Sequence, residues 1–484
     1  MKFQSTRGLE KNVISAEAII RGIAKDGGLY VPDTFPDLYH LLEKEESLSY
    51  EELAYTVIKE FFTDINAEDL KDAINKAYNN RFDVKVKNNF LELYHGPTSA
   101  FKDAALLFLP QIMQKAKKVL NVKEEVVILT ATSGDTGKAA LEGFSNVDEF
   151  KVVVYYPENG VSPIQRKQMV TQEGDNVKVI SIKGNFDNAQ TGVKNIFGDE
   201  EFRKYLVEKG YILSSANSIN IGRLVPQIVY YFYGYFKLVE QGKIKKGEEI
   251  NVVVPTGNFG NILASYYAKQ MGLPVNKFIC ASNENKVLTD FFNSGTYDKR
   301  RELVLTESPS MDILVSSNLE RLLYEASGRD SEEVKKLMTS LMEDGVYEVS
   351  EKVKEFLNGF YGNYATKDEV YKAISNVYNN KGYLIDTHTA VAEAVYEKYV
   401  EETGDKRQVL IASTASPYKF PRSICSALGI DVKDLSDFEV LDKLYEKTKV
   451  AIPKNLLNLD KKKVLHNEVW EKSEMKKALE AFLV

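Results

Sequence analysis

The chain has 484 residues, of which 44% are hydrophobic and 27% charged, and its 63 basic and 70 acidic side chains give a net charge of −7. This length can bury the cores of two to four domains, and the composition is typical of a globular protein. The negative charge and short lysine clusters argue against nucleic acid as a partner. The most apolar stretch, about 224–236, is too short and too polar to span a membrane.

The positions of the cysteines and histidines bear on the cellular compartment and on whether a metal site is expected. Cys280 and Cys425 lie far apart in apolar surroundings, so we expect buried free thiols and a cytoplasmic location. The first residues contain no apolar segment of signal-peptide length. The four histidines are too dispersed to suggest a metal centre, and no metal is predicted.

The first 90 residues predict a small helical packing domain. Apolar residues recur at helical spacing near 15–24, 50–63 and 67–80, and a Gly-Gly turn leads into a short extended piece at 27–32. These patterns indicate no catalytic residue in this region.

Lys102 is the first candidate catalytic residue. It follows a strand-like run at 90–94 and a Gly-Pro turn, and stands at the entry to an apolar helix at 104–109. A lysine among apolar side chains loses hydration, which lowers its pKa and leaves a free amine able to form a Schiff base with an aldehyde. On this segment alone, a solvated surface lysine is an equally good interpretation.

A loop at residues 132–136 predicts a first anion site, which we call the carboxylate loop. It joins a buried strand at 125–132 to a helix that begins near Gly134, and it is rich in hydroxyl groups. Free backbone N–H groups at a helix N-terminus, together with hydroxyls, suit a carboxylate. A well-capped turn without a ligand is the alternative.

The next segments alternate between strands and helices. Strands are expected at 151–157 and 177–182, with helices at 163–169 and 224–240, a spacing typical of an open parallel sheet. Ligands of such sheets bind where the strands end. The candidates for holding a substrate phosphate are Lys138, Arg166 and Asn217. A surface salt bridge explains Arg166 equally well.

Residues 257–261 form a second predicted anion site, which we call the phosphate loop. A buried strand at 250–255 ends in Thr-Gly-Asn-Phe-Gly-Asn, and a helix follows at 262–271. The glycines allow close approach of the backbone, and the amides and helix dipole suit a dianionic phosphate. The loop lacks the Gly-Lys-Ser/Thr of a Walker motif and the Gly-x-Gly-x-x-Gly pattern. Beyond it we expect helices at about 284–380, a strand from 409 and a helical tail at 430–484.

Several segments, in chain order, resemble those of threonine synthases, which are pyridoxal-phosphate enzymes of fold type II. They are residues 5–8, 26–32, 95–103, 183–190, 214–220, 257–261, 308–313 and 386–391. The resemblance implies a fold like the tryptophan synthase β-subunit, with two open, mostly parallel sheets flanked by helices. It also implies three domains: a helical domain at 1–90, an α/β domain carrying the lysine and the carboxylate loop at 91–240, and an α/β domain carrying the phosphate loop at 241–484, with a helical insertion at 284–380.

The resemblance also implies roles for individual residues. Lys102 would hold pyridoxal 5′-phosphate and act as the catalytic base, Asp135 would face the cofactor's 3′-oxygen, and Thr414 would lie against its pyridine nitrogen. The cofactor phosphate would lie against Gly257, Asn258, Phe259, Gly260 and Asn261, and the substrate against Thr132, Ser133 and Thr136.

The implied reaction converts O-phospho-L-homoserine and water to L-threonine and phosphate, as a carbon–oxygen lyase in threonine biosynthesis. Three alternatives stay open: a phospho-lyase that releases 2-oxobutanoate, a serine/threonine dehydratase, and a non-catalytic binding protein on the same scaffold. The intact lysine and both loops count against the last. The expected partners are a small-molecule substrate and, at most, a second copy of the chain, so a monomer or homodimer is expected.

Overall fold

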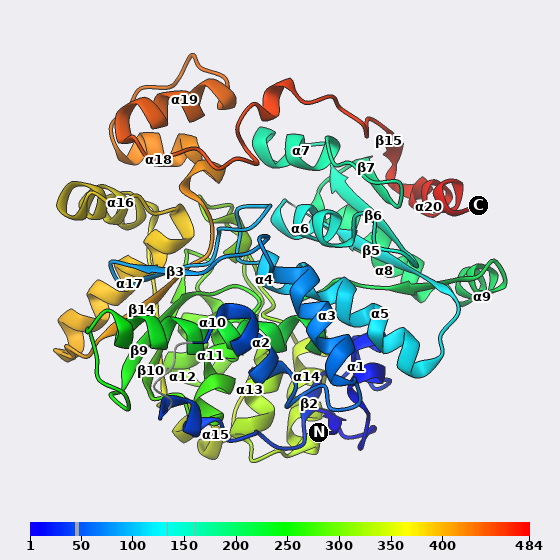
Figure 1. Cartoon of the computed structure of the whole chain (residues 1–484), viewed down its shortest axis with the longest axis horizontal. Helices are drawn as coiled ribbons and strands as arrows, with labels where there is room; N and C mark the ends of the chain where they lie inside the picture. Colours follow the sequence, from blue (N-terminus) through cyan, green and yellow to red (C-terminus); the bar gives the residue numbers. More distant parts are fainter. Residues whose placement is uncertain (44–47, 133, 160) are drawn as a thin grey trace.

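The computed structural model describes residues 1–43, 48–132, 134–159 and 161–484. Its N-terminal region pairs two short antiparallel strands and packs three helices beside them (Figure 1). A capping box between Ser49 and Glu52 starts the second of these helices, and Asn66 caps the third. The elements are β1 (Phe3–Ser5), α1 (Ser15–Arg21), β2 (Tyr30–Pro32), η1 (Tyr39–Leu42), α2 (Tyr50–Ile58) and α3 (Ala67–Tyr78).

The larger sheet has six strands in the order β13-β10-β9-β14-β4-β3, and only the β3–β4 pair is antiparallel. Its central strand β9 is buried along its whole length, which explains its continuous apolar run. The strands are β3 (Lys85–Lys87), β4 (Phe90–Glu92), β9 (Ile250–Pro255), β10 (Val275–Ser282), β13 (Phe360–Tyr364) and β14 (Val409–Ser413).

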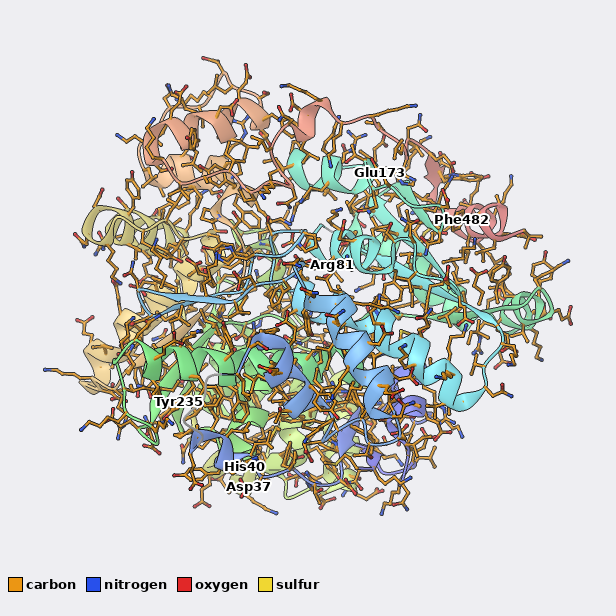
Figure 2. The ribbon with its side chains drawn as sticks, in the orientation of Figure 1. Asp37, His40, Arg81, Glu173, Tyr235 and Phe482 are labelled. Carbon is orange, nitrogen blue, oxygen red and sulfur yellow. The ribbon has the colours of Figure 1, made fainter. Side chains whose placement is uncertain are left out.

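The smaller sheet has five strands in the order β15-β7-β6-β5-β8, all parallel to their neighbours. The C-terminal helix α20 packs on it, and the Tyr155 hydroxyl donates to the Met475 carbonyl at 2.6 Å. Phe482 lies on this outer helix (Figure 2), and the Lys151 ammonium is 5.7 Å from its ring centroid. The strands are β5 (Glu125–Ala131), β6 (Phe150–Pro157), β7 (Val177–Lys183), β8 (Tyr211–Ser214) and β15 (Val469–Glu471).

Helices cover both sheets, and α4 lies between them in the centre of the molecule (Figure 1). The helices up to residue 270 are α4 (Asp103–Leu106), α5 (Phe108–Leu120), α6 (Asp135–Phe144), α7 (Pro163–Val170), α8 (Phe186–Gly198), α9 (Glu200–Glu208), α10 (Ile221–Glu240) and α11 (Gly260–Gln270). Those after it are α12 (Val287–Ser294), α13 (Leu319–Ala326), α14 (Ser331–Glu343), α15 (Glu351–Leu357), α16 (Lys367–Lys381), α17 (Thr387–Thr403), α18 (Pro421–Ala427), α19 (Asp437–Thr448) and α20 (Met475–Leu483). The remaining short elements are β11 (Thr296–Asp298), β12 (Val346–Glu348), η2 (Pro309–Met311), η3 (Pro417–Lys419), η4 (Leu459–Lys461) and η5 (Lys472–Glu474).

Three features differ from the sequence-based expectations. The segment 284–380 contains strands as well as helices, and its β13 forms one edge of the larger sheet. The C-terminal tail contributes β15 to the smaller sheet. Strand β4, just before Lys102, belongs to the larger sheet, whereas the carboxylate loop follows β5 of the smaller one. The three predicted domain ranges remain a prediction. Most of β4 falls in the range 91–240 but pairs in the larger sheet, whereas β15 falls in the range 241–484 but pairs in the smaller sheet.

The N-terminal helices support the centre of the molecule directly. The buried Tyr78 hydroxyl, at the end of α3, donates to the Ala104 carbonyl in α4 at 2.7 Å. Arg81 follows α3 beside α6 (Figure 2), and its guanidinium lies 4.0 Å from the Glu142 carboxylate. Among the described residues, no helix is both long and apolar enough to cross a membrane.

Candidate active site

Lys102 is held where the chain crosses the end of β14. Ser99 adopts a left-handed conformation with φ of 59°, and Ala100 forms an isolated bridge with Ala415. The Phe101 amide donates to the Thr414 carbonyl at 2.8 Å. Lys102 follows directly as the residue before α4, so the expected position at a helix entry is confirmed.

The ammonium of Lys102 lies in a poorly hydrated place. It is 5.0 Å from the Phe101 ring centroid and 3.5 Å from the Ser310 hydroxyl. Burial lowers the pKa of Lys102 to about 8. The charge of Asp135 opposes this shift, while nearby positive charges add to it. An amine with such a pKa is partly deprotonated at neutral pH, as a Schiff-base lysine must be.

The carboxylate loop lies at the end of β5. Gly134 has a φ of 153°, and the Thr132 hydroxyl accepts hydrogen bonds from the amides of Gly134 and Gly137, each at 3.0 Å. Thr132 therefore shapes the start of α6. Thr136 is half-buried at the same helix end. Ser133, predicted to contact the substrate, lies outside the described residues.

Asp135 is a buried carboxylate with a buried counter-charge. It forms an ion pair with Lys419, and the Gln165 amide donates to it at 2.9 Å. Burial alone would raise the pKa of Asp135, but Lys419 and Lys102 hold it well below its usual range. Lys419 also donates to the Thr98 carbonyl at 3.1 Å. The pair thus connects the carboxylate loop to the segment that carries Lys102.

The phosphate loop lies between β9 and α11 of the larger sheet. Phe259 is left-handed, with φ of 63°, and its ring is buried. The Asn258 carbonyl accepts from the amide and side chain of Asn318 at 3.1 and 2.9 Å, and the Gly257 carbonyl accepts from Ser316 at 2.7 Å. These bonds fix the carbonyls of the loop.

The N–H groups of the same loop remain available. Among the described residues, none accepts a hydrogen bond from the amides of Gly257, Asn258 or Phe259. The buried Nδ2 of Asn261 also has no partner there, although its Oδ1 accepts from Tyr231. Buried donors without acceptors are unfavourable unless a ligand supplies them. The loop therefore fits a bound phosphate, in agreement with its sequence.

Ser310 brings the phosphate loop and Lys102 together. A Cβ added to Gly257 would lie 2.7 Å from the Ser310 carbonyl oxygen, so only glycine fits there. The Ser310 amide donates to Nε2 of His388 at 3.2 Å, and Nδ1 of His388 lies 2.8 Å from the Asp386 carboxylate. His388 is buried and packs against the Phe420 ring. Sequence analysis assigned no chemistry to Ser310 or Lys419, although Ser310 lies within the family-like segment 308–313.

Among the described residues, no hydrogen bond or ion pair joins Lys102 to the three residues proposed to hold a substrate phosphate. The Lys138 ammonium is bound by Glu142, at 2.9 Å, and by Gln172. Arg166 and Asn217 are exposed. Their proposed role stays a prediction.

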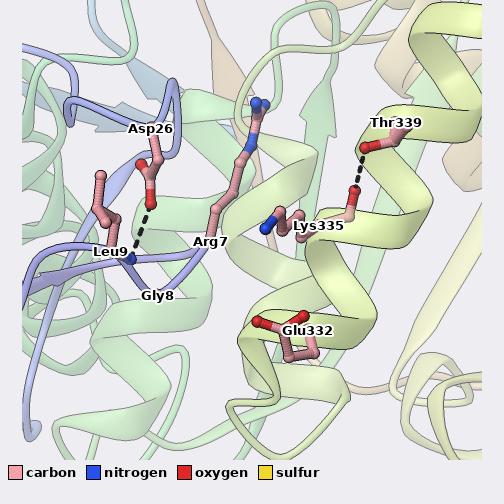
Figure 3. Close-up of a pocket in the computed structure, with 7 residues that line it drawn as sticks. All are labelled: Arg7, Gly8, Leu9, Asp26, Glu332, Lys335 and Thr339. Atoms are coloured by element: carbon pink, nitrogen blue, oxygen red, sulfur yellow. Dashed lines mark hydrogen bonds between the residues drawn. The ribbon is translucent and has the colours of Figure 1, made fainter.

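A separate surface hollow of about 430 Å³ lies between the N-terminal segment and α14 (Figure 3). None of the predicted site residues lines it. In it the Leu9 amide donates to Asp26 at 2.9 Å, and Arg7 is paired with Glu320 at 2.9 Å. Arg7 and Asp26 thus have internal partners, and the hollow is not the site around Lys102.

Known families match almost the whole chain. Residues 2–78 match "Threonine synthase N terminus", residues 83–414 match "Pyridoxal-phosphate dependent enzyme", and residues 389–464 match "Threonine synthase, C-terminal". The chain belongs to the threonine synthase family of pyridoxal-phosphate-dependent enzymes. The proposed family and fold type are confirmed, and the family's cofactor is pyridoxal phosphate.

Individual relatives align with this chain over most of their own length. A threonine synthase from Saccharomyces cerevisiae is 36% identical over 506 residues, covering 94% of this chain and 97% of that protein. A crystal structure of pyridoxal-phosphate-bound threonine synthase from Brucella melitensis has a TM-score of 0.87 and 35% identity, covering 100% of this chain and 98% of that one. The human protein named threonine synthase-like 1 is 42% identical over 438 residues, and the matched part spans 86% of this chain and only 58% of that protein.

The residues present fit the family's cofactor. Lys102 offers an amine of lowered pKa, and the phosphate loop offers unbonded amides and the orphaned Nδ2 of Asn261. Asp135 offers an ionised carboxylate fixed by Lys419. These groups come from both sheets and meet around α4.

Proposed function

We propose that the chain catalyses the conversion of O-phospho-L-homoserine and water to L-threonine and phosphate. The observation that carries the proposal is the place of Lys102, an amine with a pKa of about 8 that adjoins Ser310 and, through it, the phosphate loop. Near neutral pH such an amine is suited both to binding an aldehyde and to moving protons. The close agreement with threonine synthases over both chain lengths supports the same reaction.

Each group of the site has a distinct task in this proposal. Lys102 would hold the cofactor and, with its amine free, would take the proton from the substrate Cα. The bound cofactor supplies an electron sink for the charge that this proton transfer leaves. The phosphate loop anchors the cofactor phosphate through its N–H groups, and the start of α6 receives the substrate carboxylate.

Two polar side chains would tune the cofactor. Asp135, kept ionised by Lys419, faces the 3′-oxygen in this proposal, and Lys419 offsets the repulsion between the two negative groups. Thr414, buried at the end of β14, would offer its hydroxyl to the pyridine nitrogen. A hydroxyl donates a hydrogen bond there without protonating the ring.

A phospho-lyase that releases 2-oxobutanoate is the second candidate. It would use the same cofactor contacts and differ only in whether water adds to the substrate. The 42% identity to proteins called threonine synthase-like 1, of which this chain covers 58%, is the observation that keeps it in consideration. A serine/threonine dehydratase is a third candidate, and it would act on unphosphorylated substrate.

Product analysis tests the proposal. The purified protein is incubated with O-phospho-L-homoserine, and phosphate, threonine and 2-oxobutanoate are measured together. Equal amounts of phosphate and threonine support the proposed reaction, whereas phosphate with 2-oxobutanoate favours the lyase. Turnover of unphosphorylated threonine would identify a dehydratase. Lys102→Ala serves as the inactive control.

We also propose a cytoplasmic enzyme that works as a monomer or homodimer on a small-molecule substrate. The free, buried thiols of Cys280 and Cys425 support a reducing compartment. Cell fractionation and sedimentation of the holoenzyme test the location and the number of copies.

A further inference from the structure

The surface hollow beside α14 contains residues of the two N-terminal family-like segments, to which the proposed function gives no task (Figure 3). Its volume of about 430 Å³ falls within the range of about 300–1,000 Å³ that is typical of small-molecule sites. Gly8, with a φ of 88°, brings the N-terminal segment directly against α14, because a Cβ there would lie 2.9 Å from that of Ser331. The hollow therefore has two walls, the N-terminal segment and one face of α14.

The N-terminal wall is fixed by its own hydrogen bonds. Asp26 accepts from the Ser5 hydroxyl at 2.7 Å and from the Leu9 amide at 2.9 Å. Burial alone would raise the pKa of Asp26, but these bonds hold it below its ordinary value. Arg7 donates to Glu320 through Nε and Nη2, at 3.0 and 2.9 Å. Among the described residues, none accepts a hydrogen bond from Nη1 of Arg7, so this wall keeps one cationic donor available.

The α14 wall carries one negative and one positive side chain, Glu332 and Lys335. Both are exposed and extend from the helix toward the N-terminal segment (Figure 3). In α15, Glu351 and Lys354 have the same order and spacing, and they form an ion pair at 2.9 Å. Glu332 and Lys335 form no such pair, and within the described parts of the chain neither side chain has another partner. Two opposite charges are thus free to bind a ligand.

The charges around the hollow balance one another. Arg7 and Lys335 are positive, whereas Asp26 and Glu332 are negative. A polyanion would meet the two carboxylates there, and a simple cation would meet the ammonium and guanidinium groups. A dipolar ion, which carries one charge of each sign, avoids both conflicts.

Glu332 and Lys335 have a spacing suited to a small dipolar ion. Side chains three residues apart on a helix have Cβ atoms about 5–6 Å apart. The ammonium and carboxylate of a free α-amino acid are joined through a single carbon, so one such molecule fits between the two side chains. Leu9 is 68% exposed beside the same hollow and offers apolar surface to the rest of the ligand.

We propose that the surface hollow binds a free α-amino acid, with its carboxylate on Lys335 and its ammonium on Glu332. The site is separate from the one around Lys102, and the proposal does not depend on the proposed reaction. Charge-assisted hydrogen bonds at both ends select for ligands that carry both groups.

The N-terminal wall of the hollow is connected to the phosphate loop through α13. Glu320, the partner of Arg7, lies in the first turn of α13 and also accepts from the Thr6 hydroxyl at 2.6 Å. Asn318, directly before α13, donates to the Asn258 carbonyl at 2.9 Å. An amino acid bound in the hollow would therefore contact the wall that supports the phosphate loop.

Calorimetric titration of the holoenzyme tests the proposal. L-Valine and L-threonine are the probes, and N-acetyl-L-valine and L-valinamide each lack one of the two charges. The cofactor absorbance is recorded in parallel, because an amino acid that enters the site around Lys102 changes it.

Matched variants locate the binding. Lys335→Met and Glu332→Gln each remove one charge from the hollow. Lys336→Met and Glu333→Gln make the same changes at the next positions of α14, which do not line it. Circular dichroism confirms that each variant is folded.

We expect at least one of the two amino acids to bind, with an affinity that falls at least tenfold in both Lys335→Met and Glu332→Gln and is unchanged in the two control variants. N-acetyl-L-valine and L-valinamide should bind at least tenfold more weakly than L-valine. The proposal is overturned if neither amino acid binds, or if binding is equal in all variants, as it would be for a ligand held only around Lys102. Derivatives that bind as tightly as L-valine would overturn the choice of a dipolar ligand. Each result is independent of whether the wild-type protein forms threonine.

Discussion

Lys419 and Asp135 form a buried ion pair that joins two distant parts of the chain beside the candidate catalytic lysine. Lys419 follows the last strand of the larger sheet, whereas Asp135 begins α6 on the smaller one. Both charges act on Lys102, and in opposite directions. The pair therefore couples the arrangement of the two sheets to the protonation of the reactive amine.

Removing Lys419 should destabilise the protein by leaving Asp135 as an unpaired buried charge. We expect Lys419→Met to lower the free energy of unfolding by about 3–5 kcal/mol, measured by denaturant titration. Because both charges are then absent, the double variant Lys419→Met/Asp135→Asn should recover most of that loss. A single variant as stable as the wild type would show that the pair contributes nothing to stability.

The lowered pKa of Lys102 predicts how cofactor loading depends on pH. Only the free amine reacts with the cofactor aldehyde, so the loading rate of apoprotein should rise through pH 6.5–8 and level off above the pKa of about 8. A lysine with the ordinary value of 10.5 would show a rate that still rises at pH 10. The rate is followed through the visible absorbance band, which Lys102→Ala should lack. A profile without a plateau would contradict the buried amine.

Local patterns were enough to predict the main strands and the places of the two loops that follow β5 and β9. The apolar run of β9 and the glycines that follow it carry the information within a few consecutive residues. The short strands β13 and β15 were missed because neither has an apolar run of its own, and each forms by pairing along the edge of an existing sheet.

The contacts around Lys102 were harder to predict, since they join residues far apart in the chain. Ser310 and Lys419 look like ordinary polar residues in sequence, and only the fold brings them to Lys102 and Asp135.

Gly257→Ala should weaken cofactor binding by crowding the loop against Ser310. The added Cβ would lie 2.7 Å from the Ser310 carbonyl oxygen, so the backbone must move. Gly260→Ala, whose Cβ would meet nothing closer than 3.5 Å, should have a smaller effect. We expect about a tenfold or larger difference in cofactor affinity between the two variants, which absorbance titration measures. Equal affinities would contradict this packing.

Thr414→Ala tests the proposed contact with the pyridine nitrogen. The backbone bond from Phe101 to the Thr414 carbonyl does not involve the side chain, so the Lys102 segment should keep its position. We expect the cofactor to bind while turnover falls by about 10–100-fold, as for loss of one buried hydrogen bond of about 1–3 kcal/mol. Thr414→Ser keeps the hydroxyl and should retain most of the activity. Turnover equal to that of the wild type in both variants would contradict the proposed contact between Thr414 and the pyridine nitrogen.

His388 supports the phosphate loop indirectly, through Ser310. Its Nε2 accepts from the Ser310 amide while Asp386 binds Nδ1, so the ring fixes the segment that packs on Gly257. His388→Leu leaves the half-buried Ser310 amide without this acceptor, at a cost of about 1–3 kcal/mol, and should weaken cofactor binding by about tenfold or more. His388→Gln offers a carbonyl oxygen in place of Nε2 and should retain more affinity. If both variants bind the cofactor like the wild type, the histidine only fills space beside Phe420.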